Sequence, residues 1–531
     1  MLSNRRLVLT CAIFLCCNTA LLVFFVKFNI GERCYITINK DESIPAVLPE
    51  NFLSIGIDTS QVQHHNTLDF SNKRFGELAA ALAPARVRLG GTLSDLLIFS
   101  ADENPPLPCQ HYVHTSNDSA HPPLECFYLT GSKWTQINEF CKATNLKLLF
   151  TFNVLMRNEH GWNSHNALEI LKYSHEKKYD IDWQLGNEPN SFHHVFNVTI
   201  TPQVLAHDFK KLRKLLNTNG YKKSLLVGPD TTRPQEHQPN CLKYMVEFLG
   251  NGSHSISVRS WHQYYLNSRT ATLEEFWNPK TFDLLKEQIE TMQSHTKDYN
   301  NIPMWLTETS TSYGGGAPGL SNTYAGSPLW VDKLGLAARY NITSVFRQSF
   351  YGGNYSMIDH DFEPLPDWWI SVLYKKLVGS KVLNLTCKCS QYQRMYAHCA
   401  NTKYTSDPTA ITIYAVNLQL EKAKFLLNGT AFKSNNLDID EYIISAPSNN
   451  RKTKTILLNG WPLQYESSVP NFKPNHIKYG NHISMPPYSI GFWVIKNTSD
   501  FISTSAACIS FLIFLACQSR KNSYYKQLTF R

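Results

Sequence analysis

The chain has 531 residues, of which 43% are hydrophobic, 12% aromatic and 18% charged. A single hydrophobic core stops growing near about 250–300 residues, so this length predicts a large domain with a smaller companion, and the aromatic content excludes a disordered chain. Fifty-one basic residues against 42 acidic ones give a net charge of +9, which favours a polyanionic partner: nucleic acid, an anionic membrane or an acidic polysaccharide.

The first residues predict entry into the secretory pathway. Arg5 and Arg6 precede an apolar stretch from Leu7 to Phe28, and a basic flank followed by an apolar run is typical of a signal peptide. At about 20 residues the stretch is also long enough to span a bilayer. Residues 1–33 are therefore either a signal peptide or a signal anchor, and the remainder is expected to be extracellular, lysosomal, or anchored with its bulk in the lumen.

Sequons and cysteines agree with export. Several Asn-x-Ser/Thr sequons behind a leader favour N-glycosylation, and the cysteines outside the leader are expected to form disulfides whose connectivity the sequence leaves open. The predicted glycosylation sites are Asn117, Asn197, Asn251, Asn341, Asn384, Asn428 and Asn497, and Asn354 is a further sequon.

Eight short β-rich runs with helical segments between them follow the leader. Alternating strands and helices predict a parallel sheet, and eight units predict a (β/α)8 TIM barrel over residues 49–378, with active residues at the C-terminal ends of the strands. A doubly wound sheet is the rival, but no Gly-x-Gly-x-x-Gly follows the first run. The predicted strands are Phe52–Asp58, Arg86–Gly90, Leu146–Phe152, Ile181–Gly186, Ser224–Gly228, Ser257–Trp261, Pro303–Thr307 and Thr343–Phe350; the predicted helices are Leu168–Lys178, Ala206–Asn217, Leu273–Ser294 and Leu329–Tyr340.

The barrel is interrupted near residues 100–128 by a segment rich in Pro, Asn, Asp, Ser and His. This composition predicts a long exposed insertion, and Cys109 and Cys126 bracket most of it. The insertion is either a surface loop tied down by these cysteines or a protease-sensitive linker that covers the site until it is cut.

Beyond about Val382 the helical pattern gives way to short β-rich runs. Asn428-Gly429 and Asn459-Gly460 are turn signals, so residues 379–500 predict a C-terminal β-sandwich, to which residues 34–48 add a strand. Residues 501–531 form a hydrophobic and then basic tail. The predicted strands here are Ile411–Asn417, Tyr442–Ser445, Thr455–Leu458 and Ile490–Ile495.

Two glutamates stand at the ends of the fourth and seventh predicted barrel strands. Glu188 follows Gly186-Asn187, and Glu308 lies within Pro-Met-Trp-Leu-Thr-Glu-Thr-Ser, so both carboxylates are expected at the same rim of the barrel. A protonated and an ionised carboxyl group together perform glycoside hydrolysis. Asn187 suits a retaining site, because its amide can hydrogen-bond the sugar 2-hydroxyl. The pair predicts a retaining glycosidase that needs no cofactor and no metal.

Longer motifs resemble glycoside hydrolase family 79. The segments Trp183–Phe192, Trp261–Thr272 and Thr307–Ser321 are similar to those of its animal endo-β-glucuronidases. The resemblance implies a barrel with a β-sandwich, Glu188 as the proton donor and Glu308 as the nucleophile. It also implies an acidic polysaccharide, heparan sulfate or hyaluronan, rather than nucleic acid, as the partner.

The resemblance further implies substrate contacts and a disulfide. Backbone groups after the nucleophile and a tyrosine hydroxyl are expected to hold the uronate carboxylate. Family members end in a cysteine that pairs with the sandwich, which implies a Cys399–Cys508 bond and excludes a membrane span in the tail; Cys141 is expected to pair with Cys109 or Cys126. The implied substrate-binding residues are Asp58, Thr92, Asn187, Arg233, Tyr265, Gly314, Gly315, Gln348 and Tyr355.

Departures from the family pattern leave three hypotheses. This chain has His262-Gln263-Tyr264-Tyr265 where members acting on heparan sulfate have His-His-Tyr-Tyr, it lacks a basic pair after Arg233, and Thr307 replaces a usual Gly. Leech-type hyaluronan-cleaving members carry His-Gln-Tyr-Tyr. The chain is predicted to be a retaining endo-β-glucuronidase that cleaves internal glucuronide linkages of heparan sulfate; the alternatives are a hyaluronan-cleaving enzyme and a catalytically silent glycosaminoglycan-binding relative.

Overall fold

The computed structural model describes residues 33–38, 47–63, 68–105, 124–234, 240–428, 437–480 and 482–496. Most of the predicted leader, most of the insertion and the whole tail lie outside these residues, so the leader and the Cys399–Cys508 bond stay predictions. Within the described ranges, no helix is both long and apolar enough to cross a membrane.

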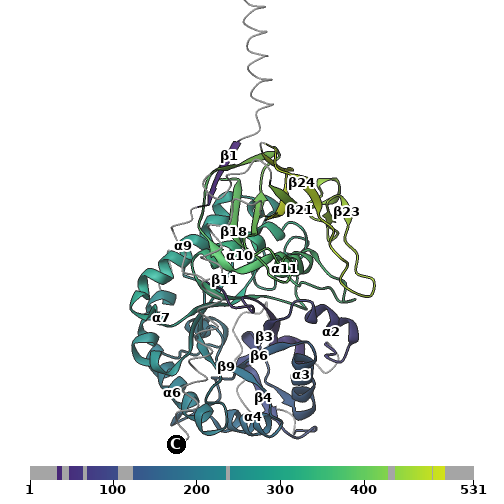
Figure 1. Cartoon of the computed structure of the whole chain (residues 1–531). Coiled ribbons are helices and arrows are strands. Elements are labelled where there is room, and N and C mark those ends of the chain that lie inside the picture. Colours follow the sequence, from purple (N-terminus) through teal and green to yellow (C-terminus); the bar gives the residue numbers. More distant parts are fainter. Residues whose placement is uncertain are drawn as a thin grey trace, which may run out of the picture.

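Eight parallel strands close a barrel in the order β10-β11-β13-β15-β2-β3-β6-β9. Each of the eight predicted runs forms one of these strands, and the predicted fold class is confirmed. Figure 1 shows the barrel in purple to teal below the green and yellow sandwich. The strands are β2 (Leu53–Asp58), β3 (Ala85–Gly90), β6 (Leu146–Phe152), β9 (Ile181–Leu185), β10 (Leu226–Thr231), β11 (Val258–Gln263), β13 (Met304–Thr309) and β15 (Ile342–Arg347).

Helices between the strands cover the outside of the barrel. The helix predicted over Leu273–Ser294 is two helices, α8 (Leu273–Phe276) and α9 (Pro279–His295), because Asn278 caps the second one and Pro279 lacks the N–H that would continue the first. The other main helices are α2 (Lys73–Ala80), α3 (Gly131–Ala143), α4 (His165–Glu176), α6 (Pro202–Thr218), α7 (Asn240–Gly252), α10 (Ser327–Arg339) and α11 (Pro366–Leu377).

The barrel interior has an apolar part and a polar part. A cluster of buried apolar side chains fills one part, and it comprises Leu149, Val227, Val258, Trp305 and Phe346. Toward the C-terminal ends of the barrel strands, the buried side chains are polar or charged, and they include Arg88, Thr151, Gln184, Asp230, Ser260, His262 and Thr307. A barrel core normally consists of packed branched apolar residues, so this buried polar layer marks the end of the barrel that carries chemistry.

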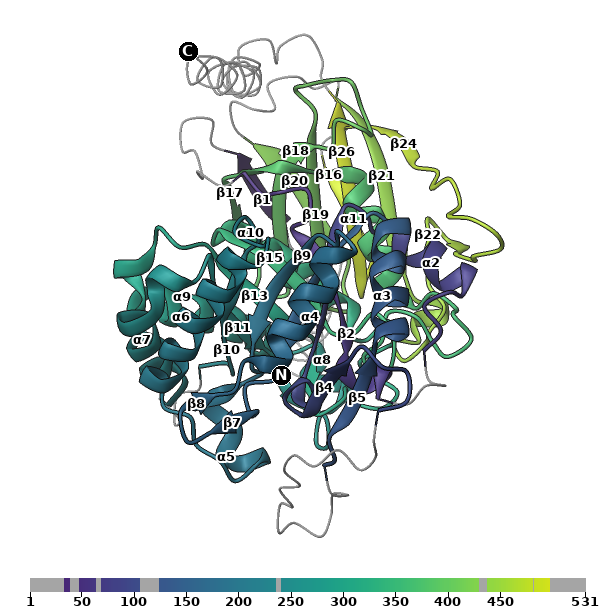
Figure 2. The ribbon, with the colours of Figure 1, turned by 90° about the horizontal axis from the view of Figure 1, so that it is seen from below.

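Two sheets form the sandwich beside the barrel (Figure 2). Phe425 of one sheet and Trp493 of the other pack within the core between them, while Tyr396 and Phe492 face the barrel helices. The first sheet is β17 (Leu385–Lys388), β1 (Arg33–Ile38), β20 (Ala423–Asn428) and β25 (Ile483–Met485); the second is β16 (Val378–Leu383), β18 (Gln393–Ala400), β19 (Ile411–Asn417), β26 (Ser489–Lys496), β21 (Asp438–Ser445), β22 (Leu457–Leu458) and β23 (Trp461–Pro462), with β24 (Asn475–Lys478) on β21.

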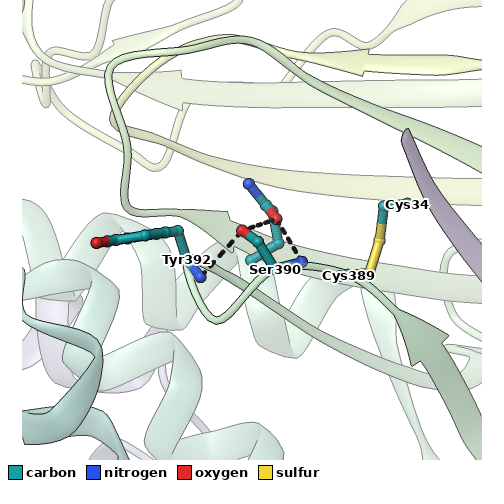
Figure 3. The surroundings of a disulfide bond; sticks show 5 residues. Cys34, Cys389, Ser390 and Tyr392 are labelled. Carbon is teal, nitrogen blue, oxygen red and sulfur yellow. Dashed lines mark hydrogen bonds between the residues drawn. A yellow bond between two sulfur atoms is a disulfide. The ribbon is translucent and has the colours of Figure 1, made fainter. Parts of the chain in front are cut away.

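A disulfide between Cys34 and Cys389 joins β1 to the segment after β17, across 355 residues of sequence (Figure 3). The sequence left this connectivity open. Cys126 is also disulfide-bonded, but not to Cys141, which is a buried free thiol. The prediction that Cys141 forms a disulfide is therefore wrong, because α3 points this side chain into the apolar core beside Phe140.

Several predicted glycosylation sites are accessible. Asn197, Asn251 and Asn341 are exposed, and Asn384 is half-buried. Asn117 and Asn497 lie outside the described residues, as does the side chain of Asn428. Glycosylation stays a prediction at all of these sites.

The barrel and the sandwich meet closely at α10. A Cβ added at Gly335 would overlap the ring of Tyr396 in β18, whose hydroxyl donates a hydrogen bond to Asp332 Oδ1 at 2.6 Å.

We expect Gly335→Ala to lower the free energy of unfolding by about 1–3 kcal/mol, because the ring must move. Gly76→Ala in α2 is the matched control, since its added Cβ would lie 4.0 Å from Thr144 Cγ2, which is ordinary van der Waals contact, and alanine favours a helix. Urea unfolding of both variants measures this; equal stability would contradict it.

Candidate active site

Glu188 and Glu308 lie at the carboxyl ends of two barrel strands. Glu188 follows β9, and its side chain is 31% exposed. Glu308 lies in β13 with a side chain that is 12% exposed. Both carboxylates can therefore be reached from outside, while most of the surface of each side chain is covered by the protein.

Irregular backbone aims the side chains around them. The pairing of β11 with β13 shifts register so that His262 faces Glu308, and a second shift in β10 leaves Asp230 with φ +55°. Glu188 itself has φ +53°. Such bulges redirect side chains next to active sites. Here the shift lets the consecutive residues Thr307 and Glu308 both contact the polar interior of the barrel.

Arg88 of β3 connects the two strand ends. Its Nη1 donates to Glu308 Oε2 at 2.9 Å, and its Nη2 donates to Asn187 Oδ1 at 2.8 Å. Nη2 also reaches Asp230 Oδ2 at 3.0 Å, and Nε donates to Gln184 Oε1 at 2.8 Å. A guanidinium whose nitrogens are bound in this way has little freedom to rotate. Arg88 therefore fixes the carboxylate of Glu308 relative to the residue before Glu188.

Glu308 is held in its ionised form. Burial alone would raise the pKa of its carboxyl group, but the charges of His262 and Arg88 and hydrogen bonds from Tyr264 and Arg88 lower the pKa below its ordinary value. The Tyr264 hydroxyl donates to Glu308 Oε1 at 2.7 Å. Burial and the charge of Glu308 raise the pKa of Tyr264 well above its ordinary value, so the phenol stays a donor. An ionised carboxylate is what a nucleophile requires.

Glu188 is held by an imidazole and by its own backbone. His262 Nδ1 lies 2.9 Å from Glu188 Oε1, and the backbone N–H of Glu188 donates to the carbonyl of Asp230 at 3.0 Å. Burial disfavours the charged form of His262, but Glu308, Asp230 and Glu188 together raise its pKa to about 10. A protonated His262 can therefore donate a hydrogen bond to Glu188 Oε1.

A second group of predicted residues lies next to Glu308. Gln348 Nε2 donates to Asp58 Oδ2 at 3.0 Å, and the Tyr264 and Tyr355 rings are stacked with centroids 6.5 Å apart. Burial and then the charge of Glu308 raise the pKa of Asp58. The sequence-predicted residues Asp58, Gln348 and Tyr355 therefore belong to the same site as Glu308.

Other predicted residues lie at the rim. Thr92 is exposed, and the Arg233 guanidinium lies over the Tyr313 ring, 4.7 Å from its centroid. Gly314 and Gly315 follow with φ of +79° and +88°, a backbone that only glycine adopts readily. The carbonyl of Gly315 accepts from the Asn354 N–H at 2.7 Å. This contact brings the glycine turn against the segment that carries Tyr355.

Comparisons with known proteins assign the chain to a family. The profile of the glycosyl hydrolase family 79 N-terminal domain matches residues 59–335. A heparanase from Bos taurus is 35% identical over 502 residues, which cover 86% of this chain and 90% of that protein. The chain belongs to glycoside hydrolase family 79. It is therefore a glycoside hydrolase by family, as the two glutamates predicted.

Two further comparisons bear on activity and fold. An inactive heparanase-2 from Homo sapiens is 30% identical over 539 residues, which cover 89% of this chain and 90% of that protein. The crystal structure of a 4-O-α-L-rhamnosyl-β-D-glucuronidase from Fusarium oxysporum has a TM-score of 0.62 and 13% identity, covering 86% of this chain and 100% of that one. This likeness supports the barrel fold alone.

The family 79 pattern suggested Tyr265 as a substrate contact, but the structure brings Tyr264 to the site instead. The hydroxyl of Tyr265 is buried without a hydrogen-bond partner, and Lys333 Nζ lies 4.6 Å from the centroid of its ring. Side chains alternate along a strand. Continued past the end of β11 at Gln263, this alternation puts Tyr264 on the same side as His262, and Tyr265, on the other side, contacts Lys333 of α10. This alternation is the sequence signal that would have selected Tyr264.

Gln263 is also outside the family 79 site. It is fully buried, its Nε2 donates to Gln288 of α9 at 3.1 Å, and its Oε1 accepts from Thr309 Oγ1 at 3.1 Å. The side chain therefore faces the helix layer. The His-Gln-Tyr-Tyr departure lies where it cannot touch a polysaccharide.

Asp95 is a further residue that sequence reasoning missed. It lies in the short 3-10 helix Thr92–Leu96, and its Oδ2 accepts from the Asn187 N–H at 2.9 Å while its Oδ1 accepts from the Val154 N–H at 3.1 Å. Burial raises its pKa to about 7 despite these two hydrogen bonds. Asp95 thus ties the ends of β6 and β9 together directly beside Glu188.

Proposed function

We propose that the protein is a retaining endo-β-glucuronidase that cleaves internal glucuronide linkages of heparan sulfate. The observation that carries the proposal is the pair Glu188 and Glu308, both accessible, at the ends of β9 and β13 of a family 79 barrel. The same pair argues against a catalytically silent relative. A retaining mechanism needs one carboxyl group as acid and base and the other as nucleophile.

In the first step, Glu308 attacks the anomeric carbon while Glu188 gives its proton to the departing glycosidic oxygen. The electron pair of the broken bond stays on that oxygen, and the new bond joins the sugar to Glu308. Arg88 and Tyr264, which donate to the two oxygens of Glu308 at 2.9 and 2.7 Å, orient the carboxylate for attack. His262 stabilises the carboxylate that forms on Glu188.

In the second step, Glu188 acts as the base. It takes a proton from a water molecule, whose oxygen attacks the anomeric carbon and releases Glu308 as a carboxylate. Arg88 and Tyr264 then stabilise that leaving carboxylate through the same hydrogen bonds. The Asn187 amide, whose oxygen accepts from Arg88 at 2.8 Å, is proposed to bind the sugar 2-hydroxyl.

Recognition of the uronate is proposed for the rim beside Glu308. The turn at Gly314 and Gly315 and the hydroxyl of Tyr355 supply donors for a carboxylate, and Asp58, Thr92 and Gln348 are proposed as hydroxyl contacts. Arg233, stacked on Tyr313, offers a fixed positive charge at the rim for an acidic group of a neighbouring sugar. Hyaluronan is the second candidate substrate. The Gln263 of the His-Gln-Tyr-Tyr motif does not support it, because this side chain faces α9 rather than the active site.

Digestion of the two polysaccharides tests the proposal. Purified enzyme is incubated separately with heparan sulfate and hyaluronan, and the products are sized by gel filtration. Shortened heparan sulfate chains with intact hyaluronan are expected. Cleavage of hyaluronan alone would replace the substrate, and cleavage of neither would support the silent relative.

Activity is expected to peak on the acidic side of neutrality. Glu308 must be ionised, and because its pKa is lowered, activity is retained in mild acid and is lost only as the pH falls through that lowered pKa. Glu188 must be protonated for the first step, so activity also falls as the pH rises and removes this proton. The pH dependence of kcat/KM measures both limbs. An optimum above neutrality would contradict these roles.

We also propose that residues 1–33 direct the chain into the secretory pathway, with attachment to a membrane through this segment as the alternative to its cleavage. The disulfide between Cys34 and Cys389 supports an oxidising compartment. The N-terminal sequence of the protein recovered from secreting cells tests this: a start near residue 34 indicates cleavage, and a start at residue 1 in a membrane fraction indicates an anchor.

A further inference from the structure

One buried carboxylate lies beneath both catalytic glutamates. The side chain of Asp230, at the end of β10, is 1% exposed. Its Oδ2 accepts from Gln184 Nε2 at 2.7 Å and from Arg88 Nη2 at 3.0 Å. Its Oδ1 accepts from Thr307 Oγ1 at 2.7 Å and from Ser260 Oγ. Four side-chain donors therefore bind one carboxylate, and these hydrogen bonds stabilise its negative charge inside the barrel.

Asp230 reaches both glutamates through one intervening residue. Arg88 binds Asp230 with Nη2 and Glu308 with Nη1, at 3.0 and 2.9 Å. His262 Nε2 lies 3.4 Å from Asp230 Oδ2, and its Nδ1 lies 2.9 Å from Glu188 Oε1. The His262–Asp230 contact is poorly aligned as a hydrogen bond, so its effect is electrostatic. The backbone carbonyl of Asp230 also accepts from the Glu188 N–H.

The charges of this cluster balance only when Asp230 is ionised. Arg88 and a protonated His262 are the two cations, and Asp230 and Glu308 are the two anions. Burial opposes ionisation of Asp230, but Arg88 and His262 hold its pKa far below the ordinary value. The other titratable groups that face the cluster include Tyr264, Tyr355, Cys241, Asp58 and Asp95; burial raises the pKa of all five.

We propose that Asp230 is a positioning residue for both catalytic carboxyl groups, fixing Glu308 through Arg88 and keeping a positive charge against Glu188 through His262. Asp230 touches neither substrate nor reacting atoms. During the first step His262 keeps its proton, and the proton that reaches the glycosidic oxygen comes from Glu188. The inference rests on the proposed function, since it uses the roles assigned to Glu188 and Glu308.

Asp230→Asn tests the proposal, because it removes the charge and keeps the shape. We expect kcat/KM on the polysaccharide to fall by about 10²-fold or more, as expected when catalytic groups are misplaced. Thr307→Val is the matched comparison: it deletes one hydrogen bond to the same carboxylate and leaves the charge. Its loss is expected to be less than about tenfold. Equal losses in the two variants, with equal stability, would overturn the role of the charge.

A second readout does not depend on activity. The chain has 19 histidines, and selective labelling of their rings allows the His262 signal to be assigned by comparison with His262→Gln and titrated by NMR. We expect His262 to stay protonated through neutral pH in the wild-type protein and to lose its proton at clearly lower pH in Asp230→Asn. Identical titration in both would overturn the proposal. If the wild-type enzyme cleaves neither polysaccharide while His262 shifts as expected, the proposed function fails and the electrostatic link stands.

Discussion

Glu308→Gln is expected to abolish turnover of heparan sulfate, with a loss of at least about 10⁴-fold in kcat, comparable to the loss of a catalytic nucleophile in other covalent mechanisms. The amide keeps the size of the side chain but cannot form the glycosyl-enzyme ester. It also replaces the carboxylate that Arg88 and Tyr264 hold at 2.9 and 2.7 Å. Product sizing over long incubations, at high enzyme concentration, measures the residual rate.

Two controls separate chemistry from folding in this variant. Glu287→Gln removes an exposed carboxylate from α9 and is expected to retain full activity. A smaller variant, Glu308→Gly, leaves room beside Arg88 for an added azide ion, which can attack in place of the missing carboxylate and restore cleavage of an aryl β-glucuronide. Substantial activity of Glu308→Gln, together with wild-type thermal stability, would exclude Glu308 as the nucleophile.

The barrel was predictable because its signals are local. Eight β-rich runs separated by helical patterns correspond to the eight strands of the closed barrel, because alternating strands and helices favour a parallel sheet. Pro279 was a readable local signal too, and it divides the predicted helix Leu273–Ser294 into α8 and α9. The Cys34–Cys389 bond was not predictable, because it depends on a contact across 355 residues.

The two glutamates were predictable for a different reason. Strand ends of a barrel meet at one rim, so a glutamate after strand four and another in strand seven share a site without any knowledge of side-chain directions. Arg88 lies in the middle of a strand, where sequence alone does not say whether a charged residue points into the barrel. The role of Arg88 follows instead from the four hydrogen bonds that its guanidinium donates in the structure.

The buried network also depends on irregular backbone. Asp230 stands at a register shift in β10 and has φ +55°, and the shift in β13 turns Thr307 and Glu308 to the same side. Strict alternation would have sent one of these two residues outward. Bulges are common at barrel rims and next to active sites, but the regular alternation used to interpret a strand does not locate them, so the sequence located the two glutamates but not the residues that hold them.

Glu188→Gln is expected to slow cleavage in a way that depends on the leaving group. A polysaccharide hydroxyl must be protonated as it departs, and loss of a general acid costs about 10²–10⁴-fold, so kcat/KM on heparan sulfate should fall within this range. An aryl β-glucuronide with an acidic phenol as leaving group needs no proton, and the rate of its first step should change little.

The variant should also lose the basic limb of the pH profile, because that limb reports the proton on Glu188. His262, 2.9 Å from the carboxylate, can donate to the amide oxygen that replaces it, so the side chain should stay in place. Comparison of kcat/KM for the two substrates, in the variant and the wild-type enzyme, measures the effect. Equal losses on both substrates would mean that Glu188 positions the sugar rather than supplying the proton.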